Sequence, residues 1–418
     1  MTVRGDPGGE RNVRLTRALI CLMFFTFAMT SDAVGGVIPS LIAEFQLSMK
    51  AAGAFHYVPM VSIAFGALML GFLADRLGRK RTIILGLCAY ALGSLLFAFG
   101  HTFGFFVFLL AVAGLGISIF KIGGLALVGD VSPSTGSHTK LMNTAEGFFA
   151  VGSIVGPAVV ALLLSRGFSW KWLYVLAAAI CLGLIAVAAR IRDPGISCGQ
   201  ARPPGPANTL QLLKDPYLLG FSVLIMLYVA VEVAIYVWLP TYLSGYRGPY
   251  PWLPVYGLTA FFLLRAIGRF LATWLLVRLS WTGVLALFGA AILGCFVISV
   301  LGGLEAGAWS LPLSGLFMSM IYPTLNSKGI SGFDKSRHGA VAGVILFFTA
   351  LAAAVGPLAM AAISDAYGDP RFGFELATGF ALLLSVGLGF NWWADPARHR
   401  LLAADADARG TAAVVDSR

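Results

Sequence analysis

Six ionisable residues lie inside long apolar segments of the 418-residue sequence. Three are acidic and three are basic, so their formal charges cancel: Asp32, Glu146, Glu232, Lys121, Arg265 and Arg269. A charge inside a membrane-spanning helix costs about 3 kcal/mol by the less severe scales, so such residues mark functional sites and have partners nearby. The six residues could form fixed ion pairs that hold the helices together. Alternatively, they could form ion pairs whose partners change during a conformational cycle.

The buried carboxylates suit proton chemistry. Asp32 follows Thr30 and Ser31 near the middle of the first apolar segment. A carboxylate in a low-dielectric cavity holds its proton more firmly than one in water, which suits a carrier that must load and release H+. Asp32 and Glu232 are therefore predicted to act in proton coupling or substrate binding, or to be structural partners of buried cations. Glu146 lies closer to a segment end and is predicted to be a gate or pairing residue.

The buried cations allow two interpretations. Lys121 lies too deep in its segment for its ammonium to reach the membrane surface. It could hold an anionic substrate, or it could neutralise Asp32 or Glu146. Arg265 and Arg269 are four residues apart and share one helix face, where a structural role is favoured. Side chains that could also contact a substrate are Tyr228, Tyr322 and Asn326.

Composition places these residues in a membrane protein. Hydrophobic residues make up 58% of the chain and charged residues 11%, and the mean hydropathy is +0.86. Because an ordinary soluble domain carries about 25% charged residues, a soluble protein is excluded. About 20 apolar residues cross a bilayer as a helix. This length predicts twelve spans, at 17–39, 51–73, 82–100, 104–129, 141–165, 171–190, 217–244, 252–277, 281–303, 308–328, 339–363 and 372–394.

The net charge of +10 has a topological explanation. If both termini are cytoplasmic, 21 of the 29 basic residues fall on the cytoplasmic side and 5 fall outside, as the positive-inside rule requires. The surplus charge would face anionic lipid of the inner leaflet, so no nucleic-acid partner is expected.

The two halves of the chain repeat each other. Gly156 and Pro157 recur as Gly356 and Pro357, and Asp32 corresponds to Glu232 at the same separation of 200 residues. This predicts an all-α membrane protein with two pseudo-symmetric six-helix bundles and a site between them. The predicted bundles cover 1–190 and 215–395, joined by a Pro- and Gly-rich cytoplasmic linker at 191–214. A disordered cytoplasmic tail is predicted at 396–418.

A glycine-rich basic loop follows the second span. It reads Gly71-Phe72-Leu73-Ala74-Asp75-Arg76-Leu77-Gly78-Arg79-Lys80, and it resembles the G-x-L-A-D-R-x-G-R-K signature of the major facilitator superfamily. In that family the motif's Asp and Arg belong to a cytoplasmic conformational latch, a role that the resemblance implies for Asp75 and Arg79. The predicted gate residues are Gly71, Asp75, Arg76, Gly78, Arg79 and Glu146.

Three further segments resemble the fucose–proton symporter group of that superfamily. They are Leu227-Tyr228-Val229-Ala230-Val231-Glu232-Val233, Gly268-Arg269-Phe270-Leu271 and Met320-Ile321-Tyr322-Pro323-Thr324. Where that group has an acidic residue midway along the fourth span, this chain has Lys121. Few amide side chains lie within spans, although a sugar site needs several neutral hydrogen-bonding groups. A charged or less hydroxylated metabolite is therefore at least as plausible as a sugar.

These patterns predict a secondary transporter that moves a small organic solute, sugar-like or anionic, across the inner membrane by alternating access. We expect coupling to H+, with the proton gradient as energy source, a monomer, and contacts with membrane lipid. A first alternative is an exporter that exchanges H+ for a drug or metabolite, and a second is a non-transporting receptor or assembly factor. No phosphate-binding loop, cysteine pair or histidine cluster suggests ATP, a cofactor, a metal or enzyme activity.

Overall fold

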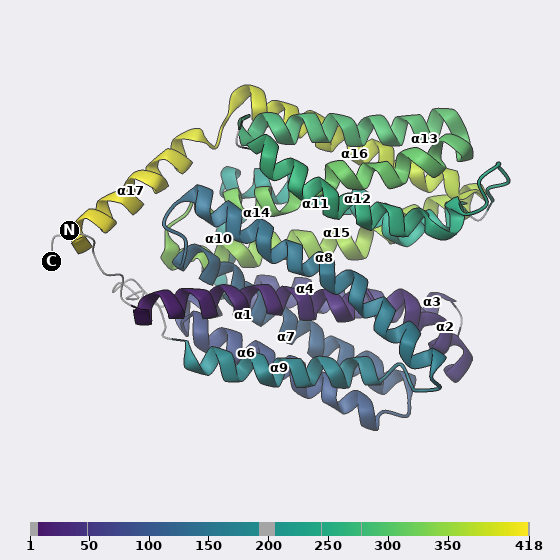
Figure 1. Ribbon diagram of the computed structural model, residues 1–418, viewed down its shortest axis with the longest axis horizontal. Helices are drawn as coiled ribbons and strands as arrows, with labels where there is room; N and C mark the ends of the chain where they lie inside the picture. Colours follow the sequence, from purple (N-terminus) through teal and green to yellow (C-terminus); the bar gives the residue numbers. More distant parts are fainter. Residues whose placement is uncertain (1–6, 48, 192–204, 244, 277, 417–418) are drawn as a thin grey trace. The chain divides into compact units, whose positions relative to one another are not determined.

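The computed structural model describes residues 7–47, 49–191, 205–243, 245–276 and 278–416. These residues form helices joined by turns, and no strand occurs among them (Figure 1). The chain divides into two compact units. Unit 1 contains Met1–Asp215, Ile330–Phe347 and Leu402–Arg418, and unit 2 contains Pro216–Gly329 and Phe348–Leu401. The predicted bundle 1–190 thus lies in unit 1, whereas a part of the predicted bundle 215–395, Ile330–Phe347, packs with unit 1.

Long apolar helices dominate unit 1. The helices from the first half of the chain are α1 (Pro7–Ser31), α2 (Val34–Phe45), α3 (Met49–Ala52), α4 (Ala54–Leu70), α5 (Leu73–Arg76), α6 (Arg79–Leu95), η1 (Leu96–Phe99), α7 (Phe103–Asp130), α8 (Thr135–Ser165), α9 (Trp172–Arg190) and α10 (Pro206–Leu212). Asp32 and Ala33 form a turn between α1 and α2, so the first predicted span is interrupted at its acidic residue.

The second half of the chain also consists mainly of long apolar helices. Its helices are α11 (Pro216–Leu243), α12 (Leu253–Leu276), α13 (Trp281–Met318), α14 (Ile321–Ser331), η2 (Lys335–Arg337), α15 (His338–Tyr367), α16 (Pro370–Ala394) and α17 (Arg398–Asp416). The first residues of α15, up to Phe347, belong to unit 1, and the rest of α15 belongs to unit 2.

Ten helical stretches of the described chain are long and apolar enough to cross a membrane, and α4 is a shorter apolar helix. Each predicted span overlaps one or more helices. The spans predicted at 281–303 and 308–328 both fall within one apolar stretch, Trp281–Ser331. Gly303 has non-helical backbone angles (φ +68°, ψ −160°), so two helical segments meet there at a kink. The number twelve therefore stays a prediction.

The repeated glycines, Gly156 and Gly356, differ in how closely a neighbouring helix approaches them. A β-carbon added at Gly156 in α8 would lie 2.0 Å from the carbonyl oxygen of Met29 in α1. In unit 2, a β-carbon added at Gly356 in α15 would lie 3.5 Å from the Cα of Ala230 in α11. Because a missing side chain lets two backbones approach, Gly156 is needed for the packing of α8 on α1, whereas the space at Gly356 accommodates a β-carbon.

The tail differs from its prediction. We expected disorder at 396–418, but α17 occupies Arg398–Asp416. Its sequence is rich in alanine, leucine and arginine, which are strong helix formers. Its Asp405 accepts hydrogen bonds from the backbone N–H of Thr135 at 2.8 Å and from the Thr135 hydroxyl at 3.0 Å. Of the predicted linker, residues 192–204 lie outside the described residues, and α10 forms within the remainder.

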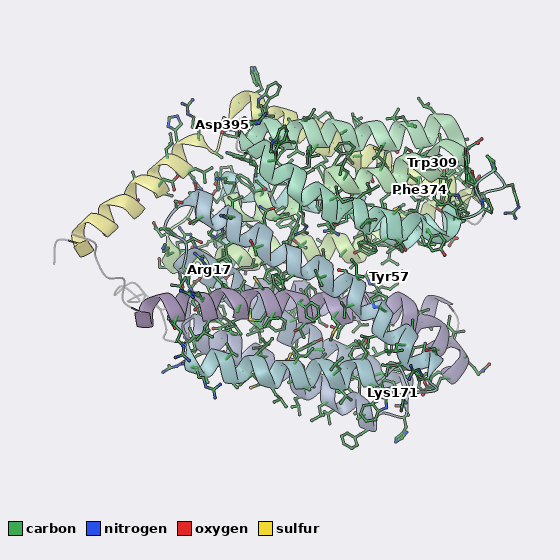
Figure 2. The ribbon with its side chains drawn as sticks, viewed as in Figure 1. Arg17, Tyr57, Lys171, Trp309, Phe374 and Asp395 are labelled. Carbon is green, nitrogen blue, oxygen red and sulfur yellow. The ribbon has the colours of Figure 1, made fainter. Side chains whose placement is uncertain are left out.

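Polar and aromatic side chains also gather in small clusters near helix ends (Figure 2). Lys171 pairs with Glu44 at 3.1 Å in unit 1. In unit 2, Trp309 packs edge-on against Tyr250 and Trp252, with ring centroids 5.6 Å and 5.5 Å away. Such amphipathic groups are typical of the boundary between lipid and water.

Candidate functional site

Lys121 lies in α7 within a cage of aromatic rings. Its ammonium nitrogen is 4.6 Å from the ring centre of Phe27, 5.3 Å from that of Phe24 and 5.6 Å from that of Phe149. The side chain is almost fully enclosed, because the residue is 4% exposed. Ring faces attract a cation, but they do not replace a counter-ion. Among the described residues, none forms a hydrogen bond with the Lys121 ammonium or pairs with it within 4 Å.

Asp32 is held by hydroxyl groups instead of by Lys121. The Ser31 hydroxyl donates to its Oδ1 at 2.8 Å, and the Ser153 hydroxyl of α8 donates to its Oδ2 at 2.5 Å. Asp32 also lies at the break between α1 and α2, where its side chain is partly exposed. The sequence reasoning missed Ser153, because a serine 121 residues away carries no local signal of this contact.

Glu146, predicted to be a gate or pairing residue, interacts electrostatically with Lys121. It lies in α8 and is 2% exposed. Asp32 is the other carboxylate that interacts electrostatically with the Lys121 ammonium. The Oε1 atom of Glu146 has no hydrogen-bond partner among the described residues. Within the group of Lys121, Asp32 and Glu146 in unit 1, no ammonium–carboxylate pair lies within 4 Å.

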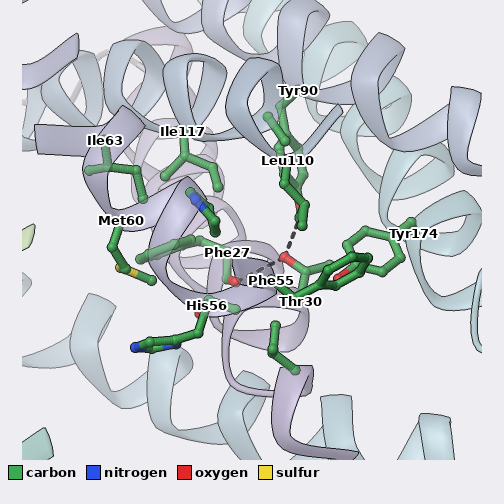
Figure 3. A pocket seen from close by; sticks show the side chains of 14 residues that line it. Phe27, Thr30, Phe55, His56, Met60, Ile63, Tyr90, Leu110, Ile117 and Tyr174 are labelled. Carbon is green, nitrogen blue, oxygen red and sulfur yellow. Dashed lines mark hydrogen bonds between the residues drawn. The ribbon is translucent and has the colours of Figure 1, made fainter. Parts of the chain in front are cut away.

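A pocket lies beside this group, inside unit 1 (Figure 3). Ser31 and Phe27 line one part of it, so it starts next to Asp32 and the aromatic cage. The other lining residues are mostly apolar: Thr30, Val34, Phe55, His56, Pro59, Met60, Ile63, Tyr90, Leu110, Ala113, Ile117 and Tyr174. Its polar groups are few, and the hydroxyls of Thr30 and Tyr90 bond to each other at 2.5 Å.

Unit 2 pairs its buried charges. Arg265 of α12 contacts Glu232 of α11 at 2.6 Å between Nη2 and Oε1. The Tyr228 hydroxyl lies 3.0 Å from the same carboxylate oxygen and 2.8 Å from the Met318 carbonyl oxygen. Arg265 and Glu232 thus form an ion pair between α12 and α11. Arg269 follows Arg265 by one turn of α12.

Two further predicted residues lie on α14 of unit 2. The Tyr322 ring centre is 6.3 Å from that of Tyr228. Asn326, one turn after Tyr322, is completely buried, and neither polar atom of its amide has a hydrogen-bond partner among the described residues. A buried amide without partners is a candidate to bind water or a ligand. No group of three or more His, Cys, Asp or Glu side chains in the described part of the chain could hold a metal ion.

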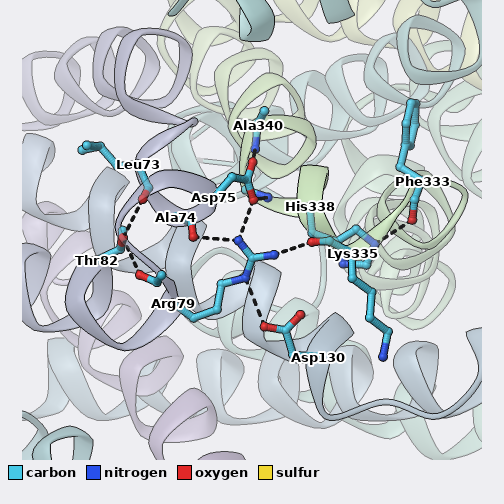
Figure 4. A network of polar contacts seen from close by, with 12 residues as sticks. Leu73, Ala74, Asp75, Arg79, Thr82, Asp130, Phe333, Lys335, His338 and Ala340 are labelled. Atoms are coloured by element: carbon cyan, nitrogen blue, oxygen red, sulfur yellow. Dashed lines mark hydrogen bonds and ion pairs between the residues drawn. The ribbon is translucent and has the colours of Figure 1, made fainter. Parts of the chain in front are cut away.

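The motif after α4 forms a connected polar network within unit 1 (Figure 4). Arg79 donates to Asp75 at 2.5 Å and to the Ala74 carbonyl oxygen at 2.7 Å. The backbone N–H groups of Gly339 and Ala340, at the start of α15, donate to the two oxygens of Asp75 at 2.9 Å and 2.8 Å. Asp75 therefore joins the loop after α4 to a helix of the second half of the chain.

Asp130 completes this network and was not predicted. It ends α7 and accepts from Arg79 Nε at 3.1 Å, and Arg79 also donates to the Lys335 carbonyl oxygen. The sequence did contain one sign of this residue, because Asp130 is an acidic residue directly after a long apolar segment. Burial raises the pKa of the Asp75 carboxyl, while the Arg79 guanidinium and the amide donors act in the opposite direction.

The remaining gate residues have different roles. Gly78 has φ +85°, a conformation that side chains disfavour, so it allows the turn into α6. A β-carbon at Gly71 would lie 2.7 Å from the Ala67 carbonyl oxygen and 3.2 Å from the Cα of Gly343, so Gly71 permits close packing on α15. Arg76 is exposed, and no described contact of the network involves it.

Comparisons with known proteins identify a family and several similar proteins. The family model described as Major Facilitator Superfamily matches residues 20–357. The L-fucose-proton symporter of Escherichia coli K12 is 24% identical over 406 residues, which cover 87% of this chain and 90% of the symporter. A glucose/galactose transporter of Brucella abortus is 23% identical over 379 residues, covering 87% and 91% of the two chains. The crystal structure of the transporter FucP in the outward conformation matches with a TM-score of 0.76 at 21% identity, covering 91% and 99%.

Proposed function

The chain belongs to the Major Facilitator Superfamily, and from this premise we propose that it is a proton-coupled secondary transporter of a small organic anion. It works by alternating access in a bacterial inner membrane, as a monomer with twelve spans and both termini in the cytoplasm. The proton gradient supplies the energy, and no cofactor takes part.

The environment of Asp32 carries the proposal. Its two partners are the Ser31 and Ser153 hydroxyls, which donate to a carboxylate and, after rotation, accept from a protonated carboxyl. Both protonation states of Asp32 are therefore accommodated without breaking an ion pair. Glu232 differs, because its contact with Arg265 favours the charged form. Asp32 is the proton carrier, and the Glu232–Arg265 pair holds α11 against α12.

Charge balance links the proton to an anionic substrate. The two carboxylates of the Lys121 group, Asp32 and Glu146, exceed its single cation by one negative charge. An anionic solute that contacts Lys121 would increase this excess in a region of low dielectric, where uncompensated charge is costly. Protonation of Asp32 restores the balance, so solute and proton bind together and move in the same direction.

The relatives named for L-fucose and for glucose and galactose make a sugar the competing substrate. Lys121 favours an anion over a sugar, because its ammonium has no counter-ion within 4 Å among the described residues. The Asp75–Arg79 network acts as the latch that holds α15 at the cytoplasmic side in one state of the cycle.

Flux measurements test the coupling. Proteoliposomes with an imposed pH gradient would be assayed for uptake of radiolabelled sugars and organic acids. Asp32→Asn is expected to lower gradient-driven uptake by about 100-fold, an effect of about 2.7 kcal/mol, and to leave exchange of solute between the two sides intact. Glu44→Gln, which changes an exposed carboxylate of unit 1, is the control and should transport normally. Gradient-driven uptake that survives both Asp32→Asn and Glu232→Gln would exclude proton coupling through these residues.

A further inference from the structure

A buried histidine lies beside the latch formed by Asp75 and Arg79. His338 is the first residue of α15 and directly precedes Gly339, whose backbone N–H donates to Asp75. The residue is 3% exposed, so its imidazole is almost fully enclosed within unit 1. Any movement of the start of α15 away from Asp75 therefore also moves this imidazole out of its surroundings.

The contacts of the imidazole fit its neutral form. Its Nε2 lies 2.9 Å from the carbonyl oxygen of Phe333 (Figure 4). Because a carbonyl oxygen only accepts, Nε2 carries the hydrogen atom, and Nδ1 of the neutral ring is an acceptor. Nδ1 faces the backbone of α7, where a β-carbon added at Gly129 would lie 2.1 Å from it. Among the described residues Nδ1 has no hydrogen-bond partner, so a proton added there would find no acceptor.

The charges around the ring also oppose a second proton. The charged and titratable groups on the elements around it are Asp75 of α5, Arg79 of α6, Asp130 of α7, His138 of α8 and Lys335 of η2. Arg79 donates to both carboxylates, at 2.5 Å for Asp75 and 3.1 Å for Asp130, so both already have a cation. The ring centre of His138 is 6.2 Å from that of His338.

These surroundings favour a neutral His338 while the latch is closed. His338 precedes the predicted span at 339–363. Burial lowers its pKa to about 4, and the positive charges of Arg79 and Lys335 act in the same direction, whereas the hydrogen bond to Phe333 acts in the opposite direction. An imidazole in water has a pKa of about 6.5. Release of the start of α15 would therefore let this imidazole take up a proton.

We propose that His338 makes the latch sensitive to pH: the latch is closed while the imidazole is neutral, and opening of the latch takes up one proton on that imidazole. Because its pKa is lower in the closed latch than in the open one, the closed latch has its full stability above about pH 6.5 and loses stability as the pH falls toward 4. The proposal rests on the proposed function only in placing the latch at the cytoplasmic side, where acidification would then favour opening.

Hydrogen exchange at the latch tests this proposal with the purified full-length protein. The backbone N–H groups of Gly339 and Ala340 donate to Asp75, so they exchange with solvent when the latch opens. Mass spectrometry of a peptide that contains both amides gives their protection, after correction for the intrinsic pH dependence of exchange. The two pKa values, about 6.5 and about 4, predict that protection falls about 10-fold between about pH 7.5 and about pH 5.5.

Substitution of His338 assigns this effect to the imidazole. His338→Gln retains an N–H donor for the Phe333 carbonyl oxygen but takes up no proton, so protection should change by less than about 2-fold over the same range. His399→Gln, which removes an exposed histidine of α17, is the control and should retain the fall of about 10-fold.

The unaltered protein provides a second measurement if His338→Gln fails to fold. Its protection should begin to fall below about pH 6.5 and level off near pH 4. Protection that stays constant over this range, or an equal fall in folded His338→Gln, would overturn the proposal.

The exchange measurements need neither solute nor gradient, so the two proposals fail in different ways. Exchange that depends on His338 without gradient-driven flux of any solute would retain the pH-sensitive latch and remove the transport function. Gradient-driven flux with exchange that is independent of pH would retain the function and remove the role of His338.

Discussion

Units 1 and 2 differ in how they partner the charges inside their apolar segments, although the two halves of the chain repeat each other. In unit 2, Arg265 and Glu232 meet at 2.6 Å, and Tyr228 also contacts the carboxylate. In unit 1, Lys121 has aromatic rings and no counter-ion within 4 Å, and Asp32 has hydroxyl partners. A paired charge resists a change of protonation state, whereas an unpaired charge responds to a ligand or proton. Under the proposed function, the first half therefore binds solute and proton, and the second half provides rigidity.

Removing one partner of the unit 2 pair is expected to have the largest effect on stability. Glu232→Gln leaves the buried Arg265 without its counter-ion and should lower the free energy of unfolding by about 3–5 kcal/mol. Glu375→Gln removes an exposed ion pair with Arg371 and should cost about 0.5 kcal/mol or less. Denaturant unfolding in detergent measures both.

The double variant Glu232→Gln with Arg265→Met sharpens this result. If the pair is structural, removing both charges should restore most of the lost stability, because no uncompensated charge remains. Equal losses in Glu232→Gln and Glu375→Gln would contradict the contrast between the two units.

The next largest effect on stability is expected for the latch formed by Asp75 and Arg79. The latch is separate from the Lys121 group of unit 1 and from the Arg265–Glu232 pair of unit 2. Arg79→Lys keeps the positive charge but loses the planar fork that reaches Asp75 and Asp130 together, and it should cost about 2 kcal/mol. Arg76→Lys, at an exposed position, should change stability by less than about 0.5 kcal/mol. Binding of the solute to Arg79→Lys should be retained. If Arg79→Lys instead lost solute binding, the latch and the Lys121 group would be one site.

The smallest effect concerns the aromatic cage. Phe149→Leu removes one ring from Lys121 and should lower the free energy of unfolding by about 1 kcal/mol. Phe148→Leu changes the adjacent ring, which is 41% exposed, and serves as the matched control. Thermal unfolding of the two variants measures the difference. Identical unfolding temperatures would show that the rings do not stabilise the ammonium.

Local patterns predicted much of the fold. The lengths and positions of the apolar segments predicted where helices lie, since each predicted span overlaps one or more helices of the structure. The resemblance of the loop motif implied that Asp75 and Arg79 belong to one latch, and the two side chains, four residues apart, form an ion pair. The tail prediction failed because polarity was taken as a sign of disorder, while alanine and leucine favour the helix α17.

The partners of the site residues could not be predicted in the same way. Asp130 lies 51 residues from Arg79, and Ser153 lies 121 residues from Asp32. Any of many serines or acidic residues could have filled these places, and only the packing of α7 and α8 selects one. The sequence also left open whether Lys121 pairs with Asp32 or Glu146, and the structure contains neither ion pair within 4 Å.

The amino-acid sequence by itself determined that this is a helical membrane protein with six charged residues inside its apolar segments, because hydropathy and charge are properties of local segments. The tertiary structure decided which of those charges are paired, because a distance of 4 Å between residues far apart in the chain depends on helix packing. It is this packing that leaves Lys121 without a counter-ion and gives Glu232 its arginine.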